Sequence, residues 1–287
     1  MRQVSSAGFI DGTGGVRLFH QCWLPEGRKP RAVIVVTHGG AEHSGRYQNV
    51  VEYLVPRGYA VWGLDNRGHG RSEGMRGHVD RYEQIVDDLK LFCDFVRAST
   101  PGQARLFLLG HSIGGLTALS YAIKYGDPAS CAVDGLIVSS PCLALSMKVP
   151  KIKETLGRLA AQLFPRVSVD NGIPPGALSR DPAVVAAYVS DPLRHPKVTL
   201  RFYVELSNQM AKVMSRAPFV RLPCLILQAG KDDVVSPYAT KRFYAAMTCQ
   251  DRELRVYSDS YHELFNDLDR DEVLRDVASW LARHAAA

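Results

Sequence analysis

Short runs of apolar and β-branched residues alternate with stretches of helical periodicity along most of this chain of 287 residues. The apolar runs lie at residues 31–38, 59–66, 105–110, 135–140, 223–230 and 253–258. Helical stretches separate or follow them, at residues 46–57, 82–98, 113–125 and about 270–283. Strands that are joined through helices pair in parallel, and a parallel sheet is covered by helices on both faces. The pattern therefore predicts an α/β fold with a mostly parallel central sheet flanked by helices.

Residues 141–222 interrupt this alternation. The segment is rich in helix-forming residues and prolines, and it contains no convincing strand. So long an excursion from a sheet is usually functional rather than a structureless loop. We expect a helical cap at 141–222, inserted over the carboxyl edge of the sheet, where open α/β sheets bind ligands. The core domain would then comprise residues 1–140 and 223–287.

The segment 110–114, Gly-His-Ser-Ile-Gly, follows one of the apolar runs and precedes a helical stretch. A serine in a sharp strand-to-helix turn adopts a strained backbone conformation and needs small neighbours, which the glycines provide. The turn also places the hydroxyl at the N-terminus of a helix, whose positive end favours developing negative charge. The same letters occur in ordinary glycine turns, but the strand and the helix around them favour Ser112 as a nucleophile.

A serine hydroxyl needs a base to take its proton. Three histidines follow Ser112 in the chain: His195, His262 and His284. The triad of such folds runs in the order serine, acid, histidine, and the base lies between the last strand and the last helix, which selects His262. Asp232 and Asp233 both follow the strand at 223–230. In the usual pattern one residue separates the acid from a following pair of aliphatic residues, here Val234 and Val235. Asp232 is therefore predicted as the partner of His262, and Asp233 as a solvated turn residue.

The negative charge that develops during acyl transfer needs two preorganised N–H donors. One is the amide of Ile113, the residue after the nucleophile. The other should come from the loop after the strand at 31–38, and Gly40 is the predicted donor, with Gly39 allowing close approach. Three further histidines adjoin these segments and are expected to have structural roles: His38, His69 and His111.

Six segments together resemble a known family: HGGAEHSGRY, LDNRGHGRSEG, GHSIGG, DPLRHPKV, LQAGKDDVVSP and YHELFND. They are similar, in order and over nearly the whole chain, to the monoacylglycerol lipase and lysophospholipase group of α/β-hydrolases. The resemblance implies the α/β-hydrolase fold and a serine esterase that cleaves monoacylglycerols or related single-chain lipid esters. It assigns Ser112, Asp232 and His262 as the catalytic triad, with Gly40 and Ile113 as oxyanion donors. Methionine is commoner in the family at the position of Ile113, but only the backbone amide is used there.

Other functions share this machinery. A lysophospholipase or a short- or medium-chain carboxylesterase is the nearest alternative. A peptidase of the proline-iminopeptidase type would need an acidic cluster for the substrate amine, and the cap offers no obvious one. A haloalkane dehalogenase needs an aspartate in place of Ser112. A non-catalytic ligand-binding member of the fold need not keep the triad, whereas every member of it is present here. The expected acyl transfer requires no metal and no cofactor.

The formal net charge is +6, but lysines and arginines are spread along the chain, so no segment resembles a nucleic-acid-binding arm. The cap mixes apolar and basic residues over 143–164. The apolar residues are Leu143, Leu145, Met147, Val149, Ile152, Leu156, Leu159, Leu163 and Phe164, and the basic ones are Lys148, Lys151, Lys153 and Arg158. Such a surface can make transient contact with a membrane interface. The alternative is that its apolar residues pack the cap onto the core.

The six cysteines show no metal-like spacing, and in a chain of this size they are expected to be reduced and mostly buried. The N-terminus is polar and rich in glycine, without the apolar core of a signal peptide. No uninterrupted apolar run approaches the roughly 20 residues that span a bilayer. A cytoplasmic protein that reaches the membrane only at its periphery is the expectation.

Overall fold

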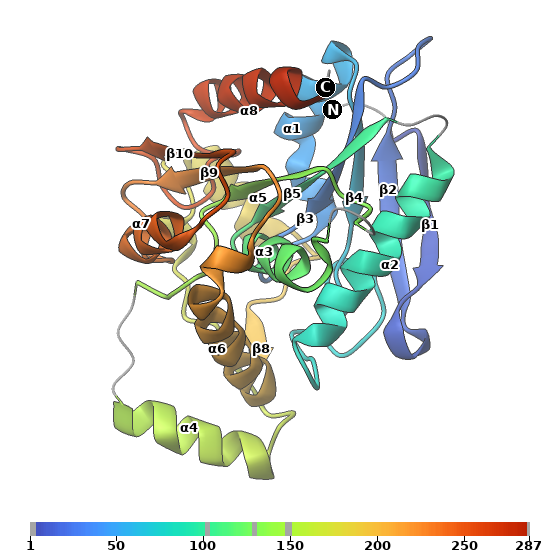
Figure 1. The fold of residues 1–287 in the computed structure, drawn as a ribbon. Coiled ribbons are helices and arrows are strands. Elements are labelled where there is room, and N and C mark those ends of the chain that lie inside the picture. The colour runs from blue at the N-terminus through green and yellow to red at the C-terminus, as the bar shows by residue number, and fades with distance from the viewer. Residues whose placement is uncertain (1–3, 101–103, 128–130, 147–150, 286–287) are drawn as a thin grey trace.

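An eight-stranded sheet runs through the described part of the chain, which in this computed structural model comprises residues 4–100, 104–127, 131–146 and 151–285. Its strand order is β1-β2-β4-β3-β5-β6-β9-β10 (Figure 1). The strands are β1 (Ser6–Asp11), β2 (Arg17–Trp23), β3 (Ala32–Thr37), β4 (Ala60–Leu64), β5 (Arg105–His111), β6 (Gly135–Ser139), β9 (Cys224–Ala229) and β10 (Arg252–Tyr257). From β4 to β10 all neighbours are parallel, whereas β2 is antiparallel to both β1 and β4. The predicted α/β fold with a mostly parallel sheet is confirmed.

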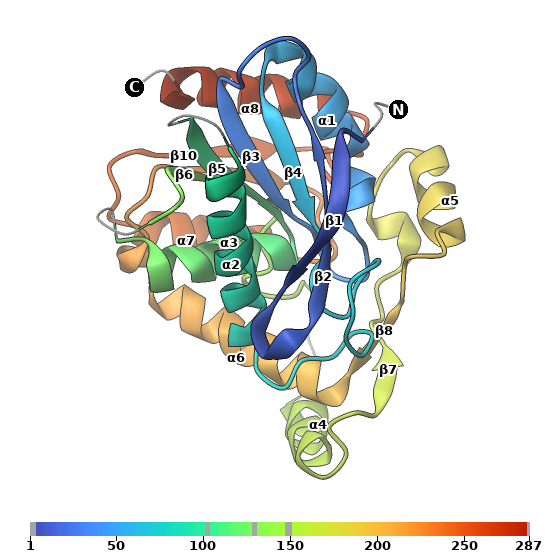
Figure 2. The same cartoon turned by 90° about the vertical axis from the view of Figure 1, so that its right-hand side faces the viewer.

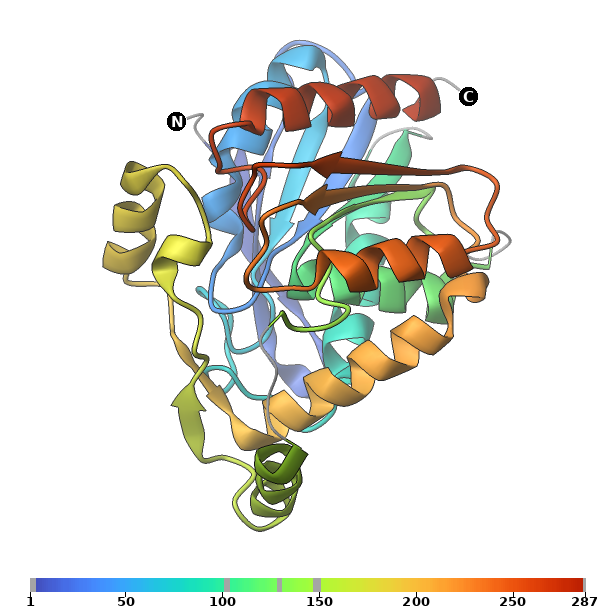
Figure 3. The same ribbon diagram turned by 90° about the vertical axis from the view of Figure 1, so that its left-hand side faces the viewer.

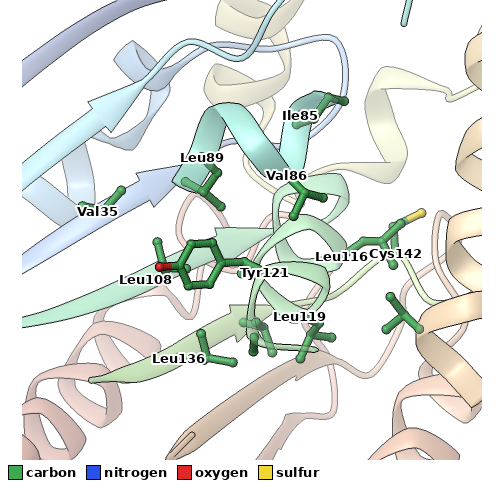
Figure 4. Close-up of a cluster of buried hydrophobic side chains, with 14 of the residues drawn as sticks. Val35, Ile85, Val86, Leu89, Leu108, Leu116, Leu119, Tyr121, Leu136 and Cys142 are labelled. Carbon is green, nitrogen blue, oxygen red and sulfur yellow. The ribbon is translucent and has the colours of Figure 1, made fainter. Parts of the chain in front are cut away.

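Helices cover both faces of this sheet, as Figure 2 shows. They are α1 (Gln48–Leu54), α2 (Glu83–Ser99), α3 (Ile113–Tyr125), α7 (Pro237–Ala246) and α8 (Arg270–Ala285). Side chains alternate between the faces along each strand. Val35 of β3 belongs to the cluster that includes α2 and α3, and its neighbour Ile34 belongs to the cluster that includes α1 and α8. Figure 4 shows Val35, Leu108 and Leu136 of the strands in one cluster with Leu89 of α2 and Leu119 of α3, so one apolar layer anchors α2 and α3 on the centre of the sheet.

The antiparallel edge, β1 and β2, was not among the predicted strands. In β1 the side chains are mostly exposed, because it is the last strand of the sheet, so its sequence carries little apolar pattern. β2 is buried, but it contains His20 and Gln21, which interrupt the apolar run. Helix α7 was also missed. Its amphipathic pattern is short and lies just after the segment that contains Asp232.

In its described residues, the interrupting segment 141–222 contains three α-helices and one small pair of strands. The helices are α4 (Lys151–Leu163), α5 (Pro182–Ser190) and α6 (Leu200–Ser215). The antiparallel pair β7 (Ser168–Asp170) and β8 (Lys197–Thr199) corrects the expectation that the segment has no strand; three residues in each are too few to give a recognisable pattern. α6 packs along α3, where Gln209 Nε2 donates to Ser120 Oγ at 2.7 Å. α4 and α5 project from the rest of the chain at different places (Figure 3).

The apolar and basic residues of 143–164 named from the sequence fall into four groups. Arg158 is half-buried, and its Nη1 donates to Asn208 Oδ1 at 2.9 Å. Met147, Lys148 and Val149 lie outside the described residues, as do the side chains of Lys151, Ile152, Lys153 and Leu156. Leu143 is buried in the core and Leu145 is half-buried. Leu159, Leu163 and Phe164 are exposed by 53%, 75% and 61%, so they do not pack α4 onto the core.

All six cysteines are free thiols, as predicted: Cys22, Cys93, Cys131, Cys142, Cys224 and Cys249. Four of them are buried and two are half-buried. Among the residues that the structure describes, no helix has the length and apolar character needed to cross a bilayer.

Candidate active site

Ser112 lies in the turn that joins β5 to α3. Its backbone has φ 53° and ψ −117°, a conformation that a residue with a side chain adopts only under constraint. Three backbone hydrogen bonds provide the constraint. The Ser112 amide donates to the carbonyl of Ser139 at 2.9 Å, and its carbonyl accepts from Leu116 and Cys142, each at 3.0 Å. The predicted strand–serine–helix turn is therefore present, with its serine fixed by main-chain contacts.

Gly114 explains why this turn needs a glycine. A Cβ atom at this position would lie 2.0 Å from the carbonyl oxygen of Thr37 and 2.6 Å from that of His38. No side chain fits into that space, so the first turn of α3 lies directly against the carboxyl end of β3. This contact brings the loop that follows β3 beside Ser112. Gly39 in that loop is in contact with Ser112, since a Cβ on Gly39 would lie 3.4 Å from the Cβ of Ser112.

His262 and Asp232 are paired in the same region, on the loops that follow β10 and β9. The Nδ1–H of His262 donates to Asp232 Oδ2 at 2.8 Å, and both side chains are buried. Asp232 Oδ1 accepts from the amides of Val234 and Val235, both at 2.9 Å. Burial alone would raise the pKa of the Asp232 carboxyl, but His262 and these two amides hold it below its usual value. The acid is therefore an anion that fixes one face of the imidazole. Asp233 is exposed.

The residues whose amides are the predicted oxyanion donors, Gly40 and Ile113, both line the cavity beside Ser112. A Cβ on Gly40 would lie 2.7 Å from the side-chain atom Cδ1 of Ile113, so the two residues are in contact. Within the described residues, neither the Gly40 amide nor the Ile113 amide donates a hydrogen bond. Both donors are available to a ligand atom beside Ser112.

The three neighbouring histidines have partners that suit structural roles. His38 Nε2 accepts from the amide of Asn66 at 2.9 Å, and its Nδ1–H donates to the carbonyl of Gly39 at 2.7 Å. His69 Nδ1–H donates to the carbonyl of Arg67 at 3.0 Å. The ring of His111 lies 4.7 Å from that of His262, and burial together with this neighbour lowers the pKa of His111 to about 4. His111 is therefore neutral at pH 7, so it adds no positive charge beside the pair.

A cavity opens above Ser112 and His262. Its polar edge includes Glu42, Asp233 and Glu263. Much of its apolar wall comes from the segment 141–222, in particular Leu145, Ile173, Leu178, Tyr188, Phe202 and Leu206. Across the described residues, no cluster of histidine, cysteine and acidic side chains could hold a metal ion.

Sequence reasoning missed one group that lines or adjoins this cavity, namely Glu42, Arg46 and Glu263. The guanidinium of Arg46 bridges the two carboxylates. Two signals in the sequence could have indicated it. Glu42 and Arg46 are four residues apart just after the predicted oxyanion loop, and Glu263 directly follows the predicted base.

Comparisons with known proteins identify the family and the fold. The serine aminopeptidase S33 family of hydrolases matches residues 28–269. A monoacylglycerol lipase of Mycolicibacterium smegmatis is 33% identical over 95% of either chain, and the phospholipase YtpA of Bacillus subtilis is 31% identical over 88% of this chain and 96% of its own length. The crystal structure of the monoacylglycerol lipase of Paleococcus ferrophilus superposes with a TM-score of 0.83 at 30% identity, covering 93% of this chain and 99% of that one. The chain thus belongs to the S33 serine hydrolase family, within the α/β-hydrolase fold and among its monoacylglycerol lipase relatives.

Proposed function

We propose that Ser112, Asp232 and His262 form the catalytic triad of this carboxylic ester hydrolase and that Gly40 and Ile113 supply its oxyanion donors. The observation that carries the proposal is the 2.8 Å hydrogen bond from His262 Nδ1 to Asp232, because it leaves Nε2 without a proton. Nε2 is then the atom that accepts the Ser112 proton. The two unused amides beside Ser112 supply the second requirement of acyl transfer, which is stabilisation of the oxyanion.

The reaction proceeds in two steps. Ser112 Oγ attacks the ester carbonyl while His262 Nε2 takes the hydroxyl proton, and the negative oxygen of the tetrahedral intermediate lies against the amides of Gly40 and Ile113. His262 returns the proton to the departing alcohol, which leaves an acyl-serine. A water molecule, deprotonated by the same imidazole, then attacks the acyl carbon and releases the carboxylic acid.

The substrate class that we infer is a single-chain lipid ester such as a monoacylglycerol. Its support is the apolar wall of the cavity and the names of the relatives, which are monoacylglycerol lipases and a phospholipase. An aminopeptidase would need a free carboxylate to bind the substrate amine. Here two of the three carboxylates that line the cavity, Glu42 and Glu263, are already paired with Arg46, which disfavours that alternative. Asp233 is the carboxylate left to bind an amine, so an aminoacyl amide belongs in the substrate panel.

We further infer that residues 141–222 act as a cap and that α4 contacts a lipid surface. The exposed Leu159, Leu163 and Phe164 lie at the end of a helix that projects from the body of the molecule (Figure 1). An exposed apolar group beside basic residues is typical of helices that bind the membrane interface. Substrate could then pass from the lipid surface to the cavity without crossing bulk water.

Reaction with a fluorophosphonate and hydrolysis of a substrate panel test the chemistry. The wild-type chain should be labelled and Ser112→Ala should not, with the thermal unfolding curve unchanged. The panel comprises monoacylglycerols, lysophospholipids, p-nitrophenyl esters of graded chain length and an aminoacyl amide. Fastest turnover of monoacylglycerols supports the proposal. Preference for a lysophospholipid or a short ester selects the corresponding alternative, and activity in Ser112→Ala refutes the triad.

Two phenylalanines test the lipid contact. Phe164 follows α4 and is 61% exposed, whereas Phe219 is 56% exposed at the far end of α6. Phe164→Ser should reduce binding to anionic vesicles and turnover of vesicle-borne monoacylglycerol, while hydrolysis of a water-soluble ester stays unchanged. Phe219→Ser is the matched control and should change neither. Equal effects of both substitutions on vesicle binding would rule out a specific contact through α4.

A further inference from the structure

A buried ion cluster joins the loop after β3 to the loop after β10. Arg46 Nη1 lies 2.8 Å from Glu42 Oε2 and 2.6 Å from Glu263 Oε1, and Arg46 Nη2 lies 2.8 Å from Glu263 Oε2. The guanidinium therefore binds Glu263 through two parallel hydrogen bonds and Glu42 through a third. The ring of Tyr188 covers the guanidinium, with its centroid 4.7 Å away. All three charged side chains are exposed by less than 10%.

Glu42 connects the cluster to the proposed oxyanion loop. Its second oxygen, Oε1, accepts from the Gly39 amide at 2.5 Å and from the Tyr47 hydroxyl at 2.9 Å. Burial alone would raise the pKa of Glu42, but Arg46 and other neighbours lower it to about 2, so the carboxylate is charged at neutral pH. Gly39 directly precedes the proposed donor Gly40. Glu42 therefore fixes the amide of Gly39, and Arg46 fixes the side chain of Glu42.

Glu263 connects the cluster to the proposed base, because it directly follows His262 in the chain. Its Oε2 also accepts from Asn266 Nδ2 at 3.0 Å, and its amide donates to the carbonyl of Leu178 at 2.8 Å. The side chain of Glu263 and its main chain are both fixed. Arg46 is therefore one of the contacts that orient the turn carrying His262, together with Asn266 and the Leu178 carbonyl.

The sheet alone does not hold these two loops together. β3 and β10 are separated in the sheet by three strands, β5, β6 and β9. No ladder hydrogen bonds run between the loops, so a small tilt of either strand would change the distance from the oxyanion donors to the imidazole. Arg46 spans that gap with bonds to both sides.

We infer that Arg46 is a positioning residue, which holds the oxyanion loop and the His262 loop at the separation that catalysis needs. The inference rests on the proposed function of Ser112, His262 and Gly40. Arg46 touches no reacting atom. It acts through Glu42 on the Gly39–Gly40 peptides and through Glu263 on the imidazole. The planar fork is essential to this role, because a lysine ammonium cannot bind one carboxylate bidentately while it holds another.

Arg46→Lys tests the inference, with Arg67→Lys as the matched control. Arg67 forms an equally buried bidentate pair with Asp88, from Nε to Oδ2 at 2.6 Å and from Nη2 to Oδ1 at 2.8 Å, but it contacts neither loop. Both variants should lose thermal stability. Arg46→Lys should also lower kcat on p-nitrophenyl butyrate about tenfold or more, with KM within about twofold of wild type, because misplaced donors weaken transition-state stabilisation rather than binding. Arg67→Lys should keep the wild-type kcat.

Glu263→Gln provides a second measurement if Arg46→Lys does not fold. It keeps the side-chain volume and leaves the pair between Arg46 and Glu42, and its kcat should fall about fivefold at unchanged KM. Equal kcat values for Arg46→Lys, Glu263→Gln and wild type would overturn the inference and leave the proposed function intact. A wild-type chain without esterase activity, or an active Ser112→Ala variant, would overturn both.

Discussion

Replacing Asp232 by asparagine should invert the hydrogen bonding of His262 without disturbing the fold. In the native chain Asp232 Oδ1 accepts two backbone N–H bonds at 2.9 Å, and Oδ2 faces His262 Nδ1 at 2.8 Å. An asparagine at this position has one oxygen, and the amides of Val234 and Val235 require it on the Oδ1 side. Its NH₂ group must then face Nδ1, so the imidazole accepts at Nδ1 and carries its proton on Nε2. In that tautomer His262 cannot take the proton of Ser112.

The expected loss is large, because the base is absent rather than weakened. A wrong tautomer in a serine triad lowers kcat by about 10⁴, which corresponds to about 5.5 kcal/mol in the activation barrier. The assay is steady-state hydrolysis of p-nitrophenyl butyrate, with thermal unfolding as a check on the fold. Asp233→Asn is the comparison: Asp233 lies at the polar edge of the cavity, but His262 hydrogen-bonds to Asp232 and not to this exposed side chain, so kcat should fall far less than in Asp232→Asn. A crippling effect of Asp233→Asn beside a harmless Asp232→Asn would refute the reasoning.

Two further predictions concern stability. Gly114→Ala should lower the free energy of unfolding by about 3 kcal/mol, because its Cβ would lie 2.0 Å from the Thr37 carbonyl in the centre of the sheet. Gly157→Ala, in α4 with no atom within 4 Å of its Cβ, should raise it by up to about 1 kcal/mol, and urea unfolding of both variants measures the contrast. The pKa of Glu42 is lowered in the folded chain from 4.5 to about 2, so its contribution is complete above pH 4.5 and is lost as the pH falls toward 2. Glu42→Gln should therefore be less stable than wild type at pH 7, with a difference that shrinks at pH 3; a difference that is the same at both values contradicts the pKa argument.

The fold could be predicted where burial imposes a pattern. The parallel strands β3, β4, β5, β6 and β9 lie between two apolar layers, so each is a largely apolar run, and all five were predicted from the sequence. β10 was predicted as well, although it lies at the edge of the sheet and most of its side chains are half-buried or exposed. Ile113–Tyr125 was predicted with its observed bounds, because the serine turn fixes its start. β1 and β2 were missed for the opposite reason. An edge strand needs little apolar surface, and the polar side chains buried in β2 have partners distant in sequence: Gln21 donates to Ser44 Oγ, and the ring of His20 packs against that of Phe95.

The candidate site also has one part that the sequence predicted and one part that it did not. Ser112, Asp232 and His262 each follow a strand at a position that the fold fixes, so their spacing along the chain predicts them. The Arg46 cluster depends on side chains that are 217 residues apart in the case of Arg46 and Glu263. Both residues lie in segments that carry the family resemblance, but neither segment indicates that they pair, and the contact exists only after β3 and β10 have been placed in one sheet. Side-chain contacts between distant strand ends are therefore the feature of the site that the sequence did not predict.

Substitutions in the core and substitutions in the loops should have different effects on stability and on the catalytic rate. Ser112 is held by main-chain hydrogen bonds between β5, β6 and α3, which also belong to the best-packed part of the core. Its position cannot shift unless the sheet itself is disturbed, so core substitutions should alter stability long before they alter the rate. The proposed donor Gly40 and the proposed base lie on loops whose separation, we infer, is set by three buried charges. Substitutions there remove few apolar contacts, yet they act on the geometry of the transition state. Substitutions in the apolar layers should therefore change stability with little effect on the rate, whereas substitutions in the charged cluster should change both.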